Sequence, residues 1–480
     1  MDKKQSGNSS SFYILISVFF FWGFVAASND ILIPVFKEKL NLEQWQSQMI
    51  SFAFYVAYTV GSILYYAISK ISGRDILNRI GYKNGIALGL LISAIGTLLF
   101  YPAAELSSFS IMISGLFIVG LGFSLQQTAA NPLAIRMGDP LKGSQRLSMA
   151  GGVNNIGTTI GPLLVSYAIF GSISSGISVA SIESVKTPYL ILGLVFVIFA
   201  AIFKFSSIPD VIDAGTEEKD QSTGSENKSV LKYPQLVLGM IAIFLYVGVE
   251  VSTASNLPEF MKQDLKTPTD KIAPFVSLYW ASLMIGRWTA SVGAFDVSMG
   301  FKKWLNFLTP YIAFAFFLMV NKIMNHDIVP FYVYGFVIVA LIIANLLSKG
   351  NPARQLLIFS VVGIIALFIG MVSSGMVSVF AFISVGLFCS TLWPCIFTLA
   401  ISGLGKHTNE GSSFLIMMIM GGGFISLLQG VLAGDNLLGI QWSYLVGVAC
   451  FAYLVFYAWK VSSILKKQGI DYDTTTGGGH

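Results

Sequence analysis

Residues 12–36 read FYILISVFFFWGFVAASNDILIPVF, an apolar run interrupted by a short polar patch. The part before Asp30 is nearly as long as the about 20 residues that a helix needs to cross a bilayer. Apolar residues resume immediately after Asp30. An aspartate at the centre of a bilayer costs about 2.5–3.5 kcal/mol on insertion scales. A chain typically keeps such an acid for a partner, a pore or a transported ion, so Asp30 is the first candidate functional residue.

The composition of the whole chain indicates a membrane protein. Of its 480 residues, 54% are hydrophobic and only 11% are charged, whereas soluble domains contain about 25% charged residues. The 38 Phe and 47 Gly residues suit helices that pack closely in lipid. The sequence therefore predicts an all-α polytopic protein embedded in the lipid bilayer.

Apolar segments long enough to span a membrane recur along the chain and predict about fourteen transmembrane helices. Six are expected near 12–36, 47–70, 84–103, 108–133, 146–170 and 187–206. Eight more are expected near 234–261, 271–295, 303–321, 329–348, 354–374, 376–403, 412–434 and 439–463. We expect an N-terminal six-helix bundle (1–206), a polar cytoplasmic linker (207–233), a C-terminal bundle (234–464) and a cytoplasmic tail (465–480).

Basic residues gather in alternate loops between these segments, as the positive-inside rule requires of cytoplasmic loops. They are Lys3, Lys4, Arg74, Arg79, Lys83, Arg136, Lys142, Arg146, Lys302, Lys303, Lys349, Arg354, Lys406, Lys466 and Lys467. Both termini are therefore expected in the cytoplasm, with the chain in the cell (inner) membrane. The net charge of +5 is spread over short loops and forms no basic stripe, so a nucleic-acid partner is not expected.

The sequence lacks the signatures of catalytic and cofactor-binding proteins. Its three cysteines, Cys389, Cys395 and Cys450, lie in apolar segments without paired spacing, which predicts buried free thiols. There is no Walker motif, no HExxH and no dinucleotide fingerprint. An enzyme and a bound cofactor are therefore not expected.

The loop after the second expected span reads GRDILNRIGYK over residues 73–83. It resembles the loop motif of the major facilitator superfamily, and a weaker echo begins at Gly286-Arg287-Trp288 in the second half. Charged side chains at helix ends can latch one gate of a carrier, so Asn78, Arg79 and Arg287 are candidate gating residues. The alternative is ordinary positive-inside charge. Repeated halves joined by a central linker favour the carrier.

Amides inside apolar helices form a second group of candidates. Gln126, Gln127 and Asn131 lie late in the fourth expected span, and Asn154 lies in the fifth. Buried amides need hydrogen-bond partners, which either a polar solute or a neighbouring helix can supply. The nearby Gly157 and Gly161 suggest close helix packing.

Five segments taken in order resemble the fucose–proton symporter family. They are NDILIP (29–34), FYPAAE (100–105), QTAANP (127–132), RLSMAGGVNNIG (146–157) and WPCIF (393–397). Within that family, YVGVEVS (246–252) and GLGKHT (403–408) are closer to the glucose/galactose branch. The resemblance covers nearly the whole chain and implies the major facilitator fold, with two six-helix bundles.

The resemblance assigns roles residue by residue. Asp30 matches the acid that takes up and releases the coupled proton near the sugar, and Asn154 matches an asparagine of the family. Gln127 falls where the fucose members have a second membrane carboxylate, Gly151 where they have a sugar-binding glutamine, and Trp393 where they have a tyrosine beside the substrate. Gln127 cannot titrate, and the incomplete hydrogen-bonding set argues against fucose.

Glu250 is the second acid at membrane depth, and polar residues that include Asn256 follow it. It is a candidate for both cation coupling and sugar binding, with a structural carboxylate as the alternative. Sugars need polar groups for their hydroxyls and aromatic rings for their apolar faces. The full set of substrate-binding candidates is Gln126, Gln127, Asn131, Asn154, Glu250, Asn256, Trp393 and Gln429.

One departure from the family pattern is an added apolar hairpin near 303–348, between the usual eighth and ninth of twelve spans. Two added helices preserve the sidedness of everything after them, and we expect them at the edge of the bundle.

These observations together predict a monomeric, cation-coupled hexose symporter. Either H⁺ or Na⁺ can be the coupled ion, and the oxygen of Gln127 tilts the prediction towards Na⁺ held at Asp30. An uncoupled facilitator, an exporter of another polar solute and a sugar sensor that does not transport remain alternatives.

Overall fold

The computed structural model describes residues 11–26, 44–73, 75–139, 142–170, 186–208, 210, 229–267, 272–295, 297–434 and 436–472. Within these ranges every regular element is a helix and no strand occurs, which confirms the predicted fold class. Ten of the described helices are long and apolar enough to cross a membrane. Asp30, the first candidate residue, lies outside the described ranges.

The chain divides into two compact units that do not follow the sequence halves everywhere. Unit 1 comprises 1–138, 156–233 and 404–419, and unit 2 comprises 139–155, 234–403 and 420–480. Two of the boundaries between the units therefore fall inside the helix Gly143–Phe170 (α7) and in the 3-10 turn Met418–Met420 (η8). The expected domain boundaries at 206 and 234 stay a prediction.

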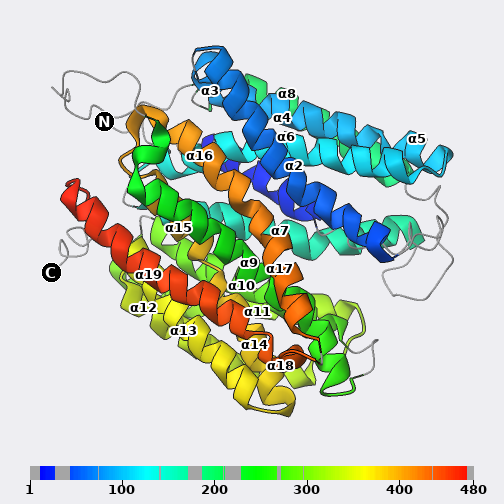
Figure 1. Cartoon of the computed structure of the whole chain (residues 1–480), viewed down its shortest axis with the longest axis vertical. Coiled ribbons are helices and arrows are strands. Elements are labelled where there is room, and N and C mark those ends of the chain that lie inside the picture. The colour runs from blue at the N-terminus through cyan, green and yellow to red at the C-terminus, as the bar shows by residue number, and fades with distance from the viewer. Residues whose placement is uncertain are drawn as a thin grey trace. The chain divides into compact units, whose positions relative to one another are not determined.

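Unit 1 is built around helix α4 (Tyr82–Leu98), which packs against α6 (Phe109–Arg136) and α8 (Lys186–Phe205). Figure 1 shows these three helices side by side. Helix α2 (Gln44–Ile71) and the short helix α16 (Thr408–Met417) lie against α6. The helix Ser11–Ala26 and the short helices α3 (Ile76–Ile80) and α5 (Phe100–Glu105) complete the described part of this unit.

Unit 2 repeats part of this packing. Helix α13 (Pro352–Val372) contacts α14 (Gly375–Cys389) and α19 (Leu445–Lys467), as α4 contacts α6 and α8. Helix α9 (Pro234–Gln263) packs on α15 (Leu392–Ile401), α17 (Gly421–Leu432) and α19, while α10 (Ala273–Ser291) packs on α14. The short helix α18 (Gly439–Trp442) precedes α19. Such a repeated packing pattern is expected of carriers that consist of two related halves.

Glycines allow the helix backbones to touch. A Cβ on Gly122 of α6 would lie 2.5 Å from the carbonyl oxygen of Gly89 on α4, and one on Gly421 would lie 2.0 Å from that of Phe244 on α9. The close-packing role predicted for Gly157 is confirmed, because its Cβ would lie 2.1 Å from the Phe20 carbonyl oxygen. Such small-residue contacts are the usual basis of helix association in lipid.

Several spans expected as continuous helices are interrupted, among them 84–103, 376–403, 412–434 and 439–463. The expected helix 376–403 breaks between α14 and α15, because Pro394 has no N–H to donate to the carbonyl of Ser390, four residues earlier. The expected helix 412–434 begins earlier, at Thr408, and changes to a 3-10 turn before α17 begins at Gly421. The sequence patterns predicted the ten described candidate spans but not these interruptions.

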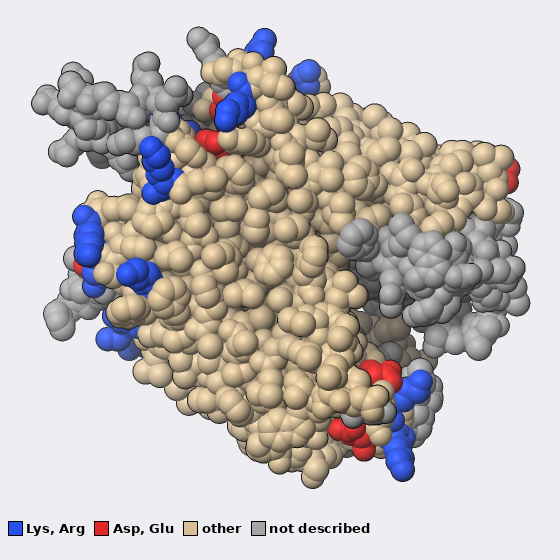
Figure 2. All heavy atoms as spheres, viewed as in Figure 1, with Lys and Arg blue, Asp and Glu red and all other residues tan. Residues whose placement is uncertain are grey.

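The added hairpin consists of α11 (Met299–Ile323) and α12 (Tyr334–Ser348), joined through a 3-10 turn (η6, Val329–Phe331). Large apolar side chains on both helices are exposed, including Trp304 at 65% and Phe336 at 80%. Figure 2 shows a broad surface without Lys, Arg, Asp or Glu, and these charged residues gather near its margins. Exposed apolar helix sides with charged ends are those of a multi-pass membrane protein. The total of fourteen spans stays a prediction.

Candidate functional site

The amides of α6 fall into two environments. Gln126 is fully buried: its Oε1 accepts the indole N–H of Trp22 at 2.9 Å and its Nε2 donates to Ser93 Oγ at 3.1 Å. Gln127 is half-buried and donates to the hydroxyl of Tyr58 at 3.0 Å. Gln126 therefore joins three helical segments of unit 1, while Gln127 keeps part of its surface open.

Asn131 and Asn154 complete the polar candidates of the first half. Asn131 is 1% exposed, and its Nδ2 has no hydrogen-bond partner in the described part of the chain. An unpartnered buried amide costs about 1–3 kcal/mol, which is typical of a position awaiting a ligand or water. Asn154 lies half-buried on α7, in the stretch that belongs to unit 2.

Glu250 lies half-buried near the middle of α9 and is surrounded by aromatic residues of unit 2. Tyr246, one turn earlier on the same helix, donates its hydroxyl to the Glu250 carboxylate. Tyr279 of α10 donates its hydroxyl to the Glu250 carbonyl oxygen at 2.8 Å. The carboxylate is therefore oriented by its own helix, and the helix is anchored to its neighbour.

Arg287 supplies the opposite charge in this part of unit 2. Its Nη1 donates to Asn155 Oδ1 of α7 at 2.8 Å, and its Nε donates to the carbonyl oxygen of Ser390 at 3.1 Å. The guanidinium attracts the Glu250 carboxylate electrostatically, yet no ion pair joins the two described side chains. A carboxylate accepts hydrogen bonds and a guanidinium donates them. Since the two are not paired with each other, both can bond to a polar solute.

The remaining candidates of unit 2 differ in exposure. Trp393 is half-buried, and its ring centroid lies 6.3 Å from that of Tyr246. Asn256 is also half-buried and donates to the Ser252 carbonyl oxygen at 2.9 Å. Gln429 is fully buried and donates to Ser443 Oγ at 3.3 Å. Trp393 thus lies near the Glu250 cluster, whereas Gln429 is enclosed in helix packing.

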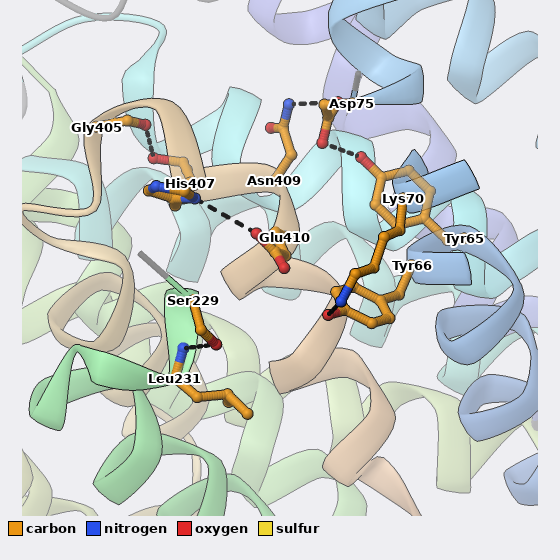
Figure 3. Close-up of polar contacts among 11 residues, drawn as sticks. Tyr65, Tyr66, Lys70, Asp75, Ser229, Leu231, Gly405, His407, Asn409 and Glu410 are labelled. Carbon is orange, nitrogen blue, oxygen red and sulfur yellow. Dashed lines mark hydrogen bonds and ion pairs between the residues drawn. The ribbon is translucent and has the colours of Figure 1, made fainter. Parts of the chain in front are cut away.

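One gating candidate of unit 1, Asn78, contacts α16 through Asn409. Figure 3 shows Asn409 directed at Asp75, whose other carboxylate oxygen faces Tyr65. Asn409 donates to Asp75 Oδ1 at 3.1 Å and to Asn78 Oδ1 at 3.2 Å, and it accepts the hydroxyl of Tyr82. Asp75 also caps α3 by accepting the N–H of Asn78 at 3.0 Å. We call Tyr65, Asp75, Asn78, Tyr82 and Asn409 the α16 latch.

Further hydrogen bonds seat α16 on the same unit. Arg136 donates from Nη2 to Thr408 Oγ1 at 2.7 Å, and Ser412 donates to the Thr128 carbonyl oxygen at 3.2 Å. Of the predicted gating residues, Asn78 takes part in the latch, Arg79 is exposed on α3, and Arg287 lies in unit 2. Sequence reasoning missed Asn409, whose only signal was the adjoining GLGKHT segment.

The chemistry predicted for the cysteines is confirmed: Cys389, Cys395 and Cys450 are free and buried. Among the described residues, no three His, Cys, Asp or Glu side chains cluster in a way that could hold a metal ion. Asp30, the predicted Na⁺ ligand, lies outside the described residues.

Comparison with known proteins supports the reading of the fold. Residues 14–348 match the model of the Major Facilitator Superfamily. The chain is 32% identical over 446 residues to a glucose/galactose transporter of Brucella abortus, with 92% of each chain covered. It is 29% identical over 469 residues to a putative glucose/galactose transporter of Helicobacter pylori, covering 95% of this chain and 98% of that protein.

The solved structures agree. The crystal structure of the fucose:proton symporter of Escherichia coli matches with a TM-score of 0.71 and 23% sequence identity. The match covers 95% of this chain and 99% of that one. At this level of identity the structural match bears on the fold alone.

Proposed function

Because the chain belongs to the Major Facilitator Superfamily, a family of transporters and not of enzymes, we propose that it takes up a hexose together with a cation. The proposed substrates are glucose- or galactose-like sugars, which are the substrates named for its relatives in Brucella abortus and Helicobacter pylori. The proposed mechanism is alternating access, in which the binding residues face each side of the membrane in turn.

The observation that carries the proposal is the group formed by Glu250, Arg287, Tyr246 and Trp393. The group brings a carboxylate, a guanidinium and two aromatic rings together on α9, α10 and α15 of unit 2. Sugar hydroxyls act as donors to a carboxylate and as acceptors from a guanidinium, while an aromatic ring covers an apolar sugar face. Gln127, Asn131, Asn154 and Asn256 are proposed as further hydroxyl-binding residues.

Gln126 and Gln429 are left out of the proposed binding set. Both side chains are fully buried; Gln126 is bonded to two neighbouring helices, whereas Gln429 donates to Ser443 in the turn after α18. A structural role explains Gln126, because a buried amide stabilises helix association when a neighbouring helix supplies its partner. Gln429 is left out because its side chain is fully enclosed.

Asp30 is the proposed coupling residue, and Glu250 is the second candidate. A cation bound at Glu250 would be repelled by the nearby guanidinium of Arg287, since like charges interact unfavourably at short range. This argument favours Asp30 for coupling and Glu250 for the sugar. Na⁺ remains the preferred ion because Gln127 offers an oxygen ligand but no titratable group, and hard cations prefer oxygen.

The α16 latch supports a proposed gating role. Asn78 and Asn409 bind α16 to α2, α3 and α4 through neutral and charge-assisted hydrogen bonds. Release of these bonds would let α16 leave unit 1, which is the proposed step that opens the cytoplasmic gate. The proposed setting is the inner membrane, with both termini in the cytoplasm.

Uptake of radiolabelled glucose and galactose into proteoliposomes tests the proposal. Uptake driven by an imposed Na⁺ gradient and lost in Asp30→Asn would support it, with Glu259→Gln as a control on the exposed end of α9. Stimulation by a proton gradient alone would replace Na⁺ by H⁺. Gradient-independent uptake unaffected by Asp30→Asn would point to a facilitator, and binding without counterflow to a sensor.

A further inference from the structure

The interruption between α14 and α15 leaves the backbone carbonyl of Ser390 without its helical donor inside a membrane span. In a continuous helix, the carbonyl of Ser390 would accept the N–H of residue 394. Residue 394 is a proline and has no N–H. The next carbonyl, that of Thr391, accepts the N–H of Cys395 at 3.2 Å in the ordinary way. The hydrogen bond that the Ser390 carbonyl would accept in a continuous helix is therefore missing, and α15 begins at Leu392.

Arg287 supplies the missing donor. Its Nε lies 3.1 Å from the Ser390 carbonyl oxygen, and Ser390 itself is fully buried. A buried carbonyl without a donor would lower the stability of the fold by about 1–3 kcal/mol, the usual cost of an unsatisfied buried polar group. The arginine of α10 therefore satisfies the carbonyl that the proline of α15 leaves without a helical donor.

Two glycines make room for this contact. A Cβ on Gly286 would lie 1.9 Å from Ser390 Oγ, so only glycine lets α10 approach the interruption. On the opposite side, a Cβ on Gly151 of α7 would lie 3.1 Å from Arg287 Cδ. Asn155, one turn along α7, then accepts Nη1 at 2.8 Å. Arg287 is thus held from both sides, with its guanidinium attracted to Glu250.

We propose that Pro394 is a positioning residue for Arg287. By leaving the Ser390 carbonyl without its helical donor, Pro394 gives Arg287 a fixed acceptor and so holds the guanidinium between Ser390 and Asn155. This role is separate from the aromatic contact of the neighbouring Trp393. Its consequence for sugar binding rests on the proposed function, whereas the positioning itself does not.

A double-mutant cycle tests the link. Pro394→Ala restores an N–H that competes for the Ser390 carbonyl, and Arg287→Lys keeps the charge but removes Nε. Each single variant is expected to raise the KM for sugar about tenfold, the usual effect of losing a charge-assisted hydrogen bond, with a smaller change in kcat. The double variant is expected to be no worse than either single one. Pro310→Ala, inside α11 of the hairpin, is the matched control and should leave the KM unchanged.

The same double-mutant cycle is repeated with the melting temperature of each purified variant as the readout, because this quantity does not depend on transport. Non-additive losses there support the positioning role even if no hexose is transported, in which case only the proposed function falls. Strictly additive losses, or a Pro394→Ala protein with the wild-type KM, would overturn the inference. If Pro394→Ala does not fold, Gly151→Ala crowds Arg287 from the other side. It must show the same non-additivity with Arg287→Lys.

Discussion

Asn409 donates a hydrogen bond of 3.1 Å to Asp75 across 334 positions of sequence, entirely inside unit 1. Asn409 is only 2% exposed and bonds to Asn78 and Tyr82 as well. Its amide therefore joins three polar side chains from the loop and helix ends that follow α2. Together with the bonds of Thr408 and Ser412, these contacts attach the ten-residue helix α16 to unit 1.

Asn409→Ala should loosen α16 and favour its release from unit 1. Removing the amide leaves buried groups of Asp75 and Tyr82 with fewer partners, at a cost of about 1–3 kcal/mol. The change is checked by the rate at which a cysteine at Ser413, now 1% exposed, reacts with a maleimide. The rate should rise in Asn409→Ala and hardly change in the control Leu88→Ala on α4, whose side chain is 45% exposed and lies outside the latch. Equal rates in all three proteins would contradict the latch.

Gly157→Ala should destabilise unit 1 strongly. The added Cβ would lie 2.1 Å from the Phe20 carbonyl oxygen and 2.8 Å from the Phe24 nitrogen, so backbone must move. Overpacking of this kind costs about 1–3 kcal/mol. Gly430→Ala on α17 is the control, because nothing lies within 4 Å of its Cβ. It should be neutral or slightly stabilising in thermal unfolding, and similar losses in both variants would exclude a packing explanation.

Glu250→Gln should weaken sugar transport without abolishing ion dependence. The amide keeps the shape of the side chain but loses the charge that attracts Arg287 and accepts the Tyr246 hydroxyl. We expect the KM for sugar to rise about tenfold, the effect of one charged hydrogen bond. Initial uptake rates over a range of sugar concentrations provide the measurement. Loss of the Na⁺ or H⁺ dependence with an unchanged KM would instead make Glu250 a coupling residue.

Trp393→Ala should lower sugar affinity, and Trp393→Phe should restore most of it. An aromatic ring covers the apolar face of a sugar, and Trp393 lies beside Tyr246 near Glu250. A fall in affinity of about tenfold corresponds to about 1.4 kcal/mol. Trp459→Ala on the exposed side of α19, where the side chain is 65% exposed, is the control. Equilibrium binding of labelled sugar to the three variants is the measurement. Equal effects of Trp393→Ala and Trp459→Ala would count against stacking.

The loop of the added hairpin should lose stability in acid. Burial lowers the pKa of His326 from 6.5, and its Nδ1 lies 3.0 Å from Asn321 Oδ1. Below pH 6.5 the unfolded chain binds a proton at this residue that the folded chain resists, so stability falls as the pH drops. His326→Gln should reduce that fall. Melting curves between about pH 8 and about pH 5 test it, and identical pH profiles of the two proteins would show that His326 has no part.

Sequence patterns predicted the spanning segments well, because each one must independently supply a long apolar helix to lipid. The added hairpin near 303–348 was recognised for this reason and is present as α11 and α12. The same patterns could not tell which of two adjacent amides is structural. Gln126 and Gln127 differ by one position on α6, yet one is enclosed by Trp22 and Ser93 and the other is half-open. That difference depends on helix rotation, which neighbouring helices fix.

The sequence by itself determined the all-helical membrane class, the placement of the apolar segments and the presence of acids at membrane depth. These follow from composition and from the cost of placing polar groups in hydrocarbon, which act on each segment separately. Only the tertiary structure decided that Asn409 meets Asp75, and that the carbonyl freed by Pro394 meets Arg287. A hydrogen bond between distant segments depends on distances and directions within a few tenths of an ångström. Only the packed helices set those distances.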